Sequence, residues 1–552
     1  MKKLMNRRDL LKLMSISGAG ASTPMDFLFA NIVSQFLYQA QAEAAGTLTS
    51  RNYVNANLFG GPIRIQFDHW LRTNADDPPM AFNGLAGTAF TYNSSGQATG
   101  MEYRTYNYRG YQVPHLFSTF SSADQDAFLD QFLVVRGYGS GMDGHPFNNA
   151  IQTLSLAGAP SISGLFMDKS DKSFQGVQFP NRIGGFASQK SLSLNKLGST
   201  GNPLNTLLQP IIKKASQNYS RDLRDRYSST ISAMRAQLRN IAADSKAGTI
   251  ASQTMSDAYS MFNRGAPDIT SWWTMNVASY TSVMEAAMRE SAIPGITARH
   301  DNSGAISVVS DGSSKYRLSG LKGDWTFAVG VDLAQCRANM TLANFAEGLA
   351  LAEYVLTNNL STVAEIDIGS FDGVWQTPTA GAAQSIPQNK DQHTTGAYPI
   401  VLYQSLVFRG VIAALLRFKT QLQVAGKWDQ TIVQITGDFG RTLRATEDGS
   451  DHGFNQMVSS IFSGVIKGGP YVVGNISTKG QNNLNVTQGY GVPIPGYNQK
   501  GIPSPIALTS TVYGLTDVDR NPWQNLAAPL VTLNTDGTLL LPYGKGKLVS
   551  GA

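Results

Sequence analysis

Two hydrophobic patterns alternate over the second half of the chain, one typical of helices and one typical of strands. Apolar residues recur every three or four positions over 341–356, and an alternating strand-like run follows at 363–368. A second helical pattern over 400–424 precedes a buried-type strand at 431–436. Strands that are joined through helices run parallel. We therefore expect an α/β fold with a largely parallel central sheet flanked by helices.

The first half of the chain shows shorter apolar runs separated by glycine-rich breaks. Residues 54–68 predict a strand, a Gly-Gly-Pro turn and a second short strand that ends at Asp68. Another short run at 132–135 is followed by the loop RGYGSGMDGH, which ends at His145. A loop this rich in glycine is typical of places where the backbone approaches another group closely.

A long amphipathic helix is predicted over residues 215–241, where apolar residues keep spacings of three and four. Its other face carries Arg221, Asp222, Arg224, Asp225 and Arg226. We interpret this charged face as solvated, with a partner-binding surface as the alternative. The helix is expected to belong to a helical insertion or cap.

The N-terminal segment MKKLMNRRDLLKLM resembles a twin-arginine export signal, with Arg7 and Arg8 as the arginine pair. The apolar stretch that follows is interrupted at Pro24 and Asp26, whereas a membrane anchor needs on the order of 20 uninterrupted apolar residues. Cleavage is predicted after Ala44. We expect export of the folded protein by the twin-arginine translocase, no stable membrane span after cleavage, and a location in the periplasm, at the cell envelope or outside the cell.

These patterns divide the chain into five segments. They are the signal peptide (1–44), the first part of the α/β core (45–205), the helical insertion or cap (206–290), the second part of the core (291–470) and a Gly/Pro-rich C-terminal region (471–552).

Composition narrows the classes of function. The 552 residues are 42% hydrophobic and 15% charged, which is typical of a globular protein. The net charge is +6, but Lys and Arg are spread along the chain, so we expect no nucleic-acid binding. Cys336 is the single cysteine, which excludes an intrachain disulfide and thiolate-rich metal sites. Any metal site must therefore use Asp, Glu and His.

Acidic residues and histidines follow several predicted strands. Asp372 and Asp438 stand at strand ends. In the loops that follow, His393 comes two residues after Asp391, and His452 directly follows Asp451. Ligands in open α/β sheets bind beyond the carboxyl edge. Carboxylate and imidazole together suit a divalent cation. The alternative is that these side chains only cap turns and helices.

The block over residues 435–474 carries a family resemblance. Asp438-Phe-Gly-Arg-Thr, Arg444, Asp451-His452 and Lys467-Gly-Gly occur in the order found in domain-of-unknown-function family 1501, a branch of the alkaline-phosphatase-like superfamily. The segments 58–68 and 136–150 also resemble earlier blocks of that family. The resemblance implies an alkaline-phosphatase-like fold and, in an active member, a metal-dependent hydrolase of phosphate or sulfate esters.

The resemblance also implies roles for particular residues. The expected ligands of a divalent metal, which would be zinc, calcium, magnesium or manganese, are Asp68, Asp372, Asp438, Asp451 and His452, with His393 in place of a lost imidazole. The expected catalytic residues are Arg441, which would hold an anionic ester group, Ser140 as the nearest nucleophile, and His145. The chain departs from the family at Gln66 and Val374, where the family commonly has Asp and His.

Two functional hypotheses follow. The first is an exported metal-dependent ester hydrolase. The second is a family member that has lost catalysis and acts as a binding or assembly protein at the cell envelope. A metal-ligand contact among His393, Asp372 and Asp438 would favour the hydrolase, and a site filled by Phe or Trp side chains would disfavour it.

Overall fold

The computed structural model describes most of the chain from residue 49 onward. The described residues are 49–74, 89–92, 98–102, 105–153, 160–170, 172, 176–180, 185–190, 192–199, 201–204, 206–207, 266–289, 308–310, 316–318, 342–368, 373–377, 384–388, 397–443, 450–453, 455–477, 489–497, 501–518, 523 and 526–549. The predicted signal peptide, the helix predicted over 215–241, Asp372 and His393 lie outside these ranges.

An eight-stranded sheet forms the centre of the protein. Its strands lie in the order β19-β7-β18-β15-β1-β12-β8-β9. Their bounds are β1 Asn52–Leu58, β7 Phe132–Tyr138, β8 Val177–Phe179, β9 Asn195–Lys196, β12 Val363–Asp367, β15 Thr431–Gly437, β18 Met457–Ser463 and β19 Tyr471–Val473. The strands predicted at 363–368 and 431–436 are thus confirmed.

The sheet is mixed, so the expectation of a largely parallel sheet was wrong. Strand β18 pairs antiparallel with both β15 and β7, whereas the other neighbours pair parallel. Parallel neighbours need a long crossover, usually a helix. Between β15 and β18 the described chain forms instead the hairpin of β16 (Gly440–Leu443) and β17 (Ser450–Gly453). The chain therefore re-enters the sheet in the opposite direction.

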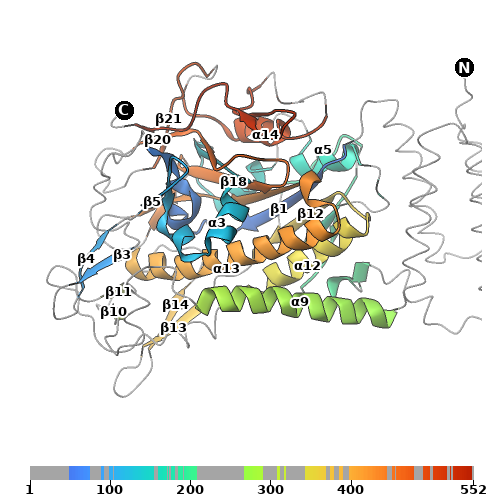
Figure 1. The fold of residues 1–552 in the computed structure, drawn as a ribbon, viewed down its shortest axis with the longest axis horizontal. Helices are drawn as coiled ribbons and strands as arrows, with labels where there is room; N and C mark the ends of the chain where they lie inside the picture. The colour runs from blue at the N-terminus through green and yellow to red at the C-terminus, as the bar shows by residue number, and fades with distance from the viewer. Residues whose placement is uncertain are drawn as a thin grey trace, which may run out of the picture.

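Helices cover both faces of the sheet (Figure 1). One face packs on α12 (Ala343–Thr357) and α13 (Ala397–Val424), and α9 (Ala266–Arg289) lies against these two helices. The other face carries α4 (His145–Ile151), α5 (Ile162–Asp168) and α14 (Pro505–Tyr513). The helices predicted over 341–356 and 400–424 are confirmed as α12 and α13.

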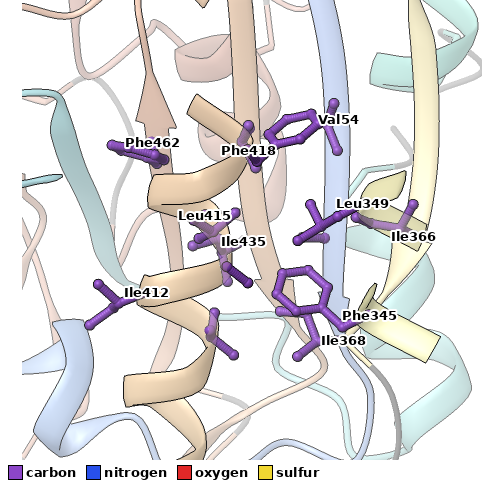
Figure 2. Packing of buried hydrophobic residues seen from close by; sticks show 14 of the residues in the cluster. Val54, Phe345, Leu349, Ile366, Ile368, Ile412, Leu415, Phe418, Ile435 and Phe462 are labelled. Carbon is purple, nitrogen blue, oxygen red and sulfur yellow. The ribbon is translucent and has the colours of Figure 1, made fainter. Parts of the chain in front are cut away.

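The alternation of side chains along β1 builds a different core on each face. Val54 packs with Leu349 of α12, Leu415 of α13 and Ile435 of β15 in one buried cluster (Figure 2). On the opposite face, the ring of Tyr53 stacks on Phe166 of α5, with 5.1 Å between ring centroids. Because successive strand residues point to opposite faces, one strand serves both layers.

The helix α9 is joined to the α12 layer by a polar contact as well as by packing. The hydroxyl of Tyr280 donates to Glu353 of α12 at 2.7 Å. Burial raises the pKa of the Glu353 carboxyl above its usual range. No helix in the described ranges is both long enough and apolar enough to cross a membrane.

The segment after β1 differs from the prediction. Residues Ile65–His69 form a short π-helix, η1, where a second strand ending at Asp68 was expected. The side chain of Arg64 pairs with Asp68 four residues later, a spacing that a helical turn brings together. The Gly60-Gly61-Pro62 break thus leads into a turn of helix, and the alternation of Ile63, Ile65 and Phe67 was misleading.

Shorter elements surround this core. The remaining strands are β2 Arg72–Thr73, β3 Ala89–Tyr92, β4 Ala98–Glu102, β5 Thr105–Tyr108, β6 Tyr111–Pro114, β10 Val308–Ser310, β11 Tyr316–Leu318, β13 Gly373–Thr377, β14 Gln384–Gln388, β20 Asn475–Ser477, β21 Gly491–Val492, β22 Thr532–Leu533, β23 Leu539–Leu540 and β24 Leu548–Val549. Other helices in the described ranges are η3 His115–Thr119, α3 Ser122–Leu129 and η4 Trp428–Gln430.

Candidate functional site

Three strands deliver the candidate residues to one edge of the sheet. Strands β1 and β15 are parallel, and Leu58 pairs with Gly437 at their carboxyl ends. Strand β7 is antiparallel to β18, which is antiparallel to β15, so β7 ends at the same edge. The turn after β1, Asp438 after β15 and the glycine-rich loop after β7 therefore emerge together.

The carboxylate of Asp438 meets the imidazole of His145 at this edge. Asp438 is fully buried, and its Oδ2 lies 2.5 Å from Nδ1 of His145. The same oxygen accepts the backbone N–H of Gly60 at 3.1 Å. The other oxygen, Oδ1, is buried and has no hydrogen-bond partner among the described residues. A buried carboxylate held in this way orients the ring and leaves one oxygen for a further group.

A second pair of the same kind lies beside the first. Nδ1 of His452, on β17, is 2.5 Å from Oδ1 of Asp143 in the glycine-rich loop. Asp143 is exposed, and its hydrogen bond to His452 lowers the pKa of the carboxyl below its usual range. In both pairs the carboxylate engages Nδ1, so proton transfer or metal contact by either ring must go through Nε2.

Aromatic contacts join the two pairs into one cluster. The rings of His145 and His452 meet edge to face, with centroids 4.5 Å apart and an interplanar angle of 84°. Phe439 stacks on His452 at 4.2 Å and meets His145 edge-on at 4.9 Å. Because Phe439 is buried and directly follows Asp438, it fixes both imidazoles relative to the end of β15.

The glycine-rich loop is held in place by its own polar groups. The side-chain amide of Asn148, on α4, donates to the carbonyl oxygens of Met142 at 2.8 Å and Gly144 at 3.1 Å. Gly144 has a φ of 130°, a conformation that favours glycine, and it immediately precedes His145. The amide of Asn57, on β1, donates to Asn149 and ties α4 to the sheet. These contacts fix where His145 stands.

Asp68 forms its hydrogen bonds with residues outside this cluster. It is fully buried in η1, and its two carboxylate oxygens are engaged by Nε and Nη2 of Arg64. The hydroxyl of Ser460 also donates to Asp68. Arg64 in turn donates to the carbonyl oxygen of Val458 at 3.0 Å. In the structure, the expected metal ligand therefore makes a buried ion pair.

Arg441 is buried and faces the backbone of the turn after β1. Its Nε donates to the carbonyl oxygen of Gly61 at 2.6 Å, and its Nη2 donates to that of Gly60 at 2.7 Å. The guanidinium expected to hold an anionic ester thus anchors the turn that hydrogen-bonds to Asp438.

The other expected residues divide into two groups. The hydroxyl of Ser140 donates to the carbonyl oxygen of Met142 at 3.0 Å and accepts its N–H at 3.2 Å, so it closes its own turn. The backbone of Asp451 pairs with Thr442 in the β16–β17 hairpin, but its side chain lies outside the described part of the structure, as do Asp372 and His393.

The described donors do not by themselves form a metal centre. No group of three His, Cys, Asp or Glu side chains within the described ranges has the geometry to hold an ion. Two ligands of one tetrahedral ion, each about 2.1 Å from it, lie about 3.4 Å apart. The 2.5 Å separations within the two pairs are therefore hydrogen-bond distances.

Sequence reasoning found three members of the cluster and missed two. His145, Asp438 and His452 were expected at the site, whereas Asp143 and Phe439 were not assigned a role. Asp143 stands two residues before His145 in the glycine-rich loop, which was the available signal. Phe439 lies within the Asp-Phe-Gly-Arg motif, so its position next to Asp438 was visible but its contact with two imidazoles was not.

Comparison with known proteins agrees with part of the resemblance. Residues 402–488 match the family model "Protein of unknown function (DUF1501)". No curated protein and no solved structure matches the chain. The matched segment contains Asp438, Phe439 and His452 but neither Asp143 nor His145. The match therefore supports the resemblance to domain-of-unknown-function family 1501 over the segment that carries one half of the site.

Proposed function

We propose that this chain is an exported hydrolase of the alkaline-phosphatase-like type that acts on phosphate or sulfate esters. The Asp438–His145 pair is the reacting centre, and the Asp143–His452 pair lies beside it. The observation that carries the proposal is the 2.5 Å contact between His145 and Asp438 at the carboxyl edge of the sheet. This edge is where open α/β sheets place their ligands.

The chemistry assigned to the pair is general acid–base catalysis. Asp438 holds His145 through Nδ1, so Nε2 is the atom that takes a proton from an attacking water. The water oxygen bonds to phosphorus or sulfur, and the bond from that atom to the alcohol oxygen breaks. The departing alcohol oxygen takes a proton from solvent, because the attacking and leaving oxygens lie in line on opposite sides of the reacting atom, and His145 releases its own proton to solvent. The products are the free alcohol and phosphate or sulfate, so atoms and charge balance.

The proposal includes a divalent ion, which would need ligands in addition to the two described Asp–His pairs. When bound, such an ion would polarise the ester and neutralise developing negative charge. Oδ1 of Asp438 is the described atom suited to it, since it is buried without a hydrogen-bond partner among the described residues. Asp372, His393 and Asp451 would have to complete the set, because the described donors alone do not.

Export by the twin-arginine translocase and a periplasmic or envelope location are also part of the proposal. They rest on the Arg7-Arg8 segment and on Ala42-Glu43-Ala44, where two small residues in the pattern small-x-small suit cleavage by signal peptidase.

A specific observation favours the second hypothesis, a family member that binds or assembles without catalysis. Asp68 and Arg441, which the resemblance implies as metal ligand and anion clamp, are both buried against internal partners. In addition, Phe439 packs on both imidazoles, and an aromatic side chain that fills the site weighs against hydrolysis. A protein with this arrangement would keep the fold and use the edge of the sheet as a binding surface.

The test measures hydrolysis and metal content on the same sample. The protein is purified without chelator and assayed with p-nitrophenyl phosphate and p-nitrophenyl sulfate, with and without added zinc, calcium, magnesium or manganese. Asp438→Asn and His145→Gln are expected to lower kcat by about 10²-fold or more. Asp536→Asn is the matched control, since Asp536 is exposed and accepts hydrogen bonds from Thr538 in its own turn.

The outcomes separate the two functions. Hydrolysis that is lost in Asp438→Asn and His145→Gln but kept in Asp536→Asn supports the hydrolase. A folded wild-type protein that hydrolyses neither ester under any metal condition overturns it and favours the binding protein.

A further inference from the structure

Two exposed apolar residues stand in the segments that carry the paired histidines and their carboxylates. Among the described residues, six large hydrophobic side chains are exposed, and two of these are Phe59 (38% exposed) and Met142 (51% exposed). The ring of Phe59 lies 5.9 Å from that of His145, centroid to centroid. Met142 directly precedes Asp143, which contacts His452. The two exposed apolar residues therefore stand in the segments after β1 and after β7, which build the Asp–His pairs.

The backbone on the Phe59 side is fixed. Phe59 follows β1 and precedes Gly60, whose N–H donates to Asp438 and whose carbonyl oxygen accepts from Arg441. Arg441 also binds the next carbonyl oxygen, that of Gly61. The turn that presents Phe59 is thus held by the same buried residues that build the site, and the exposure of its ring is not a consequence of a loosely held loop.

The backbone on the Met142 side is fixed in the same way. The hydroxyl of Ser140 bonds to both the N–H and the carbonyl oxygen of Met142. The amide of Asn148 donates to that same carbonyl oxygen at 2.8 Å. Holding an apolar side chain in water beside a polar centre gains nothing for folding, because the apolar surface stays exposed. A bound group that covers the side chain would recover that free energy.

We propose that Phe59 and Met142 form an apolar rim that binds the hydrophobic part of the substrate, namely an aryl or bulky alkyl group on the alcohol side of the ester. This inference rests on the proposed function, and it narrows the substrate from any phosphate or sulfate ester to esters of hydrophobic alcohols. The reacting group lies over the imidazoles, and the apolar group lies against Phe59 and Met142.

The test compares two substrates in matched variants. Phe59→Ser and Met142→Ser are each expected to lower kcat/KM for phenyl phosphate by about tenfold, the loss expected for removing part of an apolar contact. Both variants are expected to lower kcat/KM for methyl phosphate by a smaller factor, because a methyl group offers less apolar surface for these side chains to cover. Val424→Ser is the control, because Val424 is 83% exposed at the end of α13. It is expected to change neither value.

A binding measurement keeps this inference separable from the proposed function. Calorimetry with phenylphosphonate and methylphosphonate, which are not hydrolysed, is expected to show tighter binding of the phenyl compound and loss of this preference in Phe59→Ser. If phenylphosphonate binds more tightly but the protein hydrolyses no ester, the result supports the apolar rim and overturns the hydrolase. Hydrolysis with equal losses for phenyl and methyl phosphate in the rim variants overturns the rim and leaves the hydrolase standing. The absence of any phenyl preference in either measurement also overturns the rim.

Discussion

Nδ1 of His145 lies 2.5 Å from Oδ2 of Asp438, although the two residues are 293 positions apart in the chain. Asp438 directly follows β15, and His145 begins the helix that follows the loop after β7. Strand β18 separates β7 from β15 in the sheet. The contact therefore depends on how β18 pairs with both neighbours, and the site is a product of the sheet rather than of a local motif.

The first prediction concerns the ion pair of Asp68 with Arg64. Asp68→Ala is expected to lower the free energy of unfolding by about 3–5 kcal/mol, because it leaves a buried guanidinium without its counter-charge. Urea denaturation measures the change. The double variant Arg64→Met with Asp68→Leu is the control, and it should lose less because no unpaired charge remains. A stable Asp68→Ala protein that loses bound metal would show that Asp68 is a ligand instead.

The second prediction concerns Arg441. Arg441→Lys is expected to cost about 1–3 kcal/mol of stability, since a lysine ammonium cannot reproduce the two parallel bonds to the Gly60 and Gly61 carbonyl oxygens. Arg109→Lys is the matched control: its ion pairs with Asp126 and Asp130 are exposed, so the loss should stay below about 1 kcal/mol. If Arg441→Lys keeps full stability and raises KM for an anionic ester, Arg441 binds the substrate.

The third prediction concerns the turn that carries Gly60 and Gly61. Gly61 has a φ of 59°, and a Cβ at this position would lie 3.2 Å from Cβ and Cδ2 of Phe439. Gly110 has a φ of 83° but no atom within 4 Å of such a Cβ. Alanine at either position is expected to cost roughly 1–2 kcal/mol for the left-handed backbone.

Gly61→Ala should cost about 1 kcal/mol or more beyond Gly110→Ala, because Phe439 must shift. Thermal or urea unfolding of the two variants gives the difference. Equal losses would mean that Phe439 moves without cost and does not fix the position of the imidazoles.

Hydrophobic periodicity predicted the elements that run through the core. The helices α12 and α13 and the strands β12 and β15 each carry an apolar pattern that the sheet then buries, since core packing selects for that period. Asp438 at the end of β15 followed from the same reasoning. These predictions depend only on the local sequence and on the rule that ligands bind at carboxyl edges of parallel strands.

Contacts between distant segments could not be predicted in the same way. His452 contacts the carboxylate of Asp143 in the glycine-rich loop, although the two residues are 309 positions apart in the chain. Likewise, Asp68 follows a predicted strand but pairs with Arg64 within a helical turn. The first contact depends on how β18 is inserted antiparallel into the sheet, and the second is a local ion pair. Neither kind of contact produces a hydrophobic periodicity that could be recognised in the sequence.

The last prediction is a pH dependence that arises from His69. Its Nε2–H donates to the carbonyl oxygen of Gly489 at 3.0 Å. Burial, with the nearby Arg136 guanidinium second, lowers the pKa of His69 to about 3. Between pH 6.5 and this value the unfolded chain takes up a proton that the native state does not. The contribution of His69 to the free energy of unfolding is therefore fully present above pH 6.5. It is lost as the pH falls below that value, by at most about 1.4 kcal/mol per pH unit.

Urea unfolding of wild type and His69→Gln at pH 7 and pH 5 tests this. Glutamine does not titrate, and its amide N–H is suited to the bond that His69 makes to Gly489. Between the two pH values, wild type is expected to lose about 2 kcal/mol more than the variant, and carboxylates that titrate in both proteins cancel in the comparison. Equal losses in the two proteins would contradict a depressed pKa of His69, and a greater loss in the variant would mean that His69 binds a proton in the folded state.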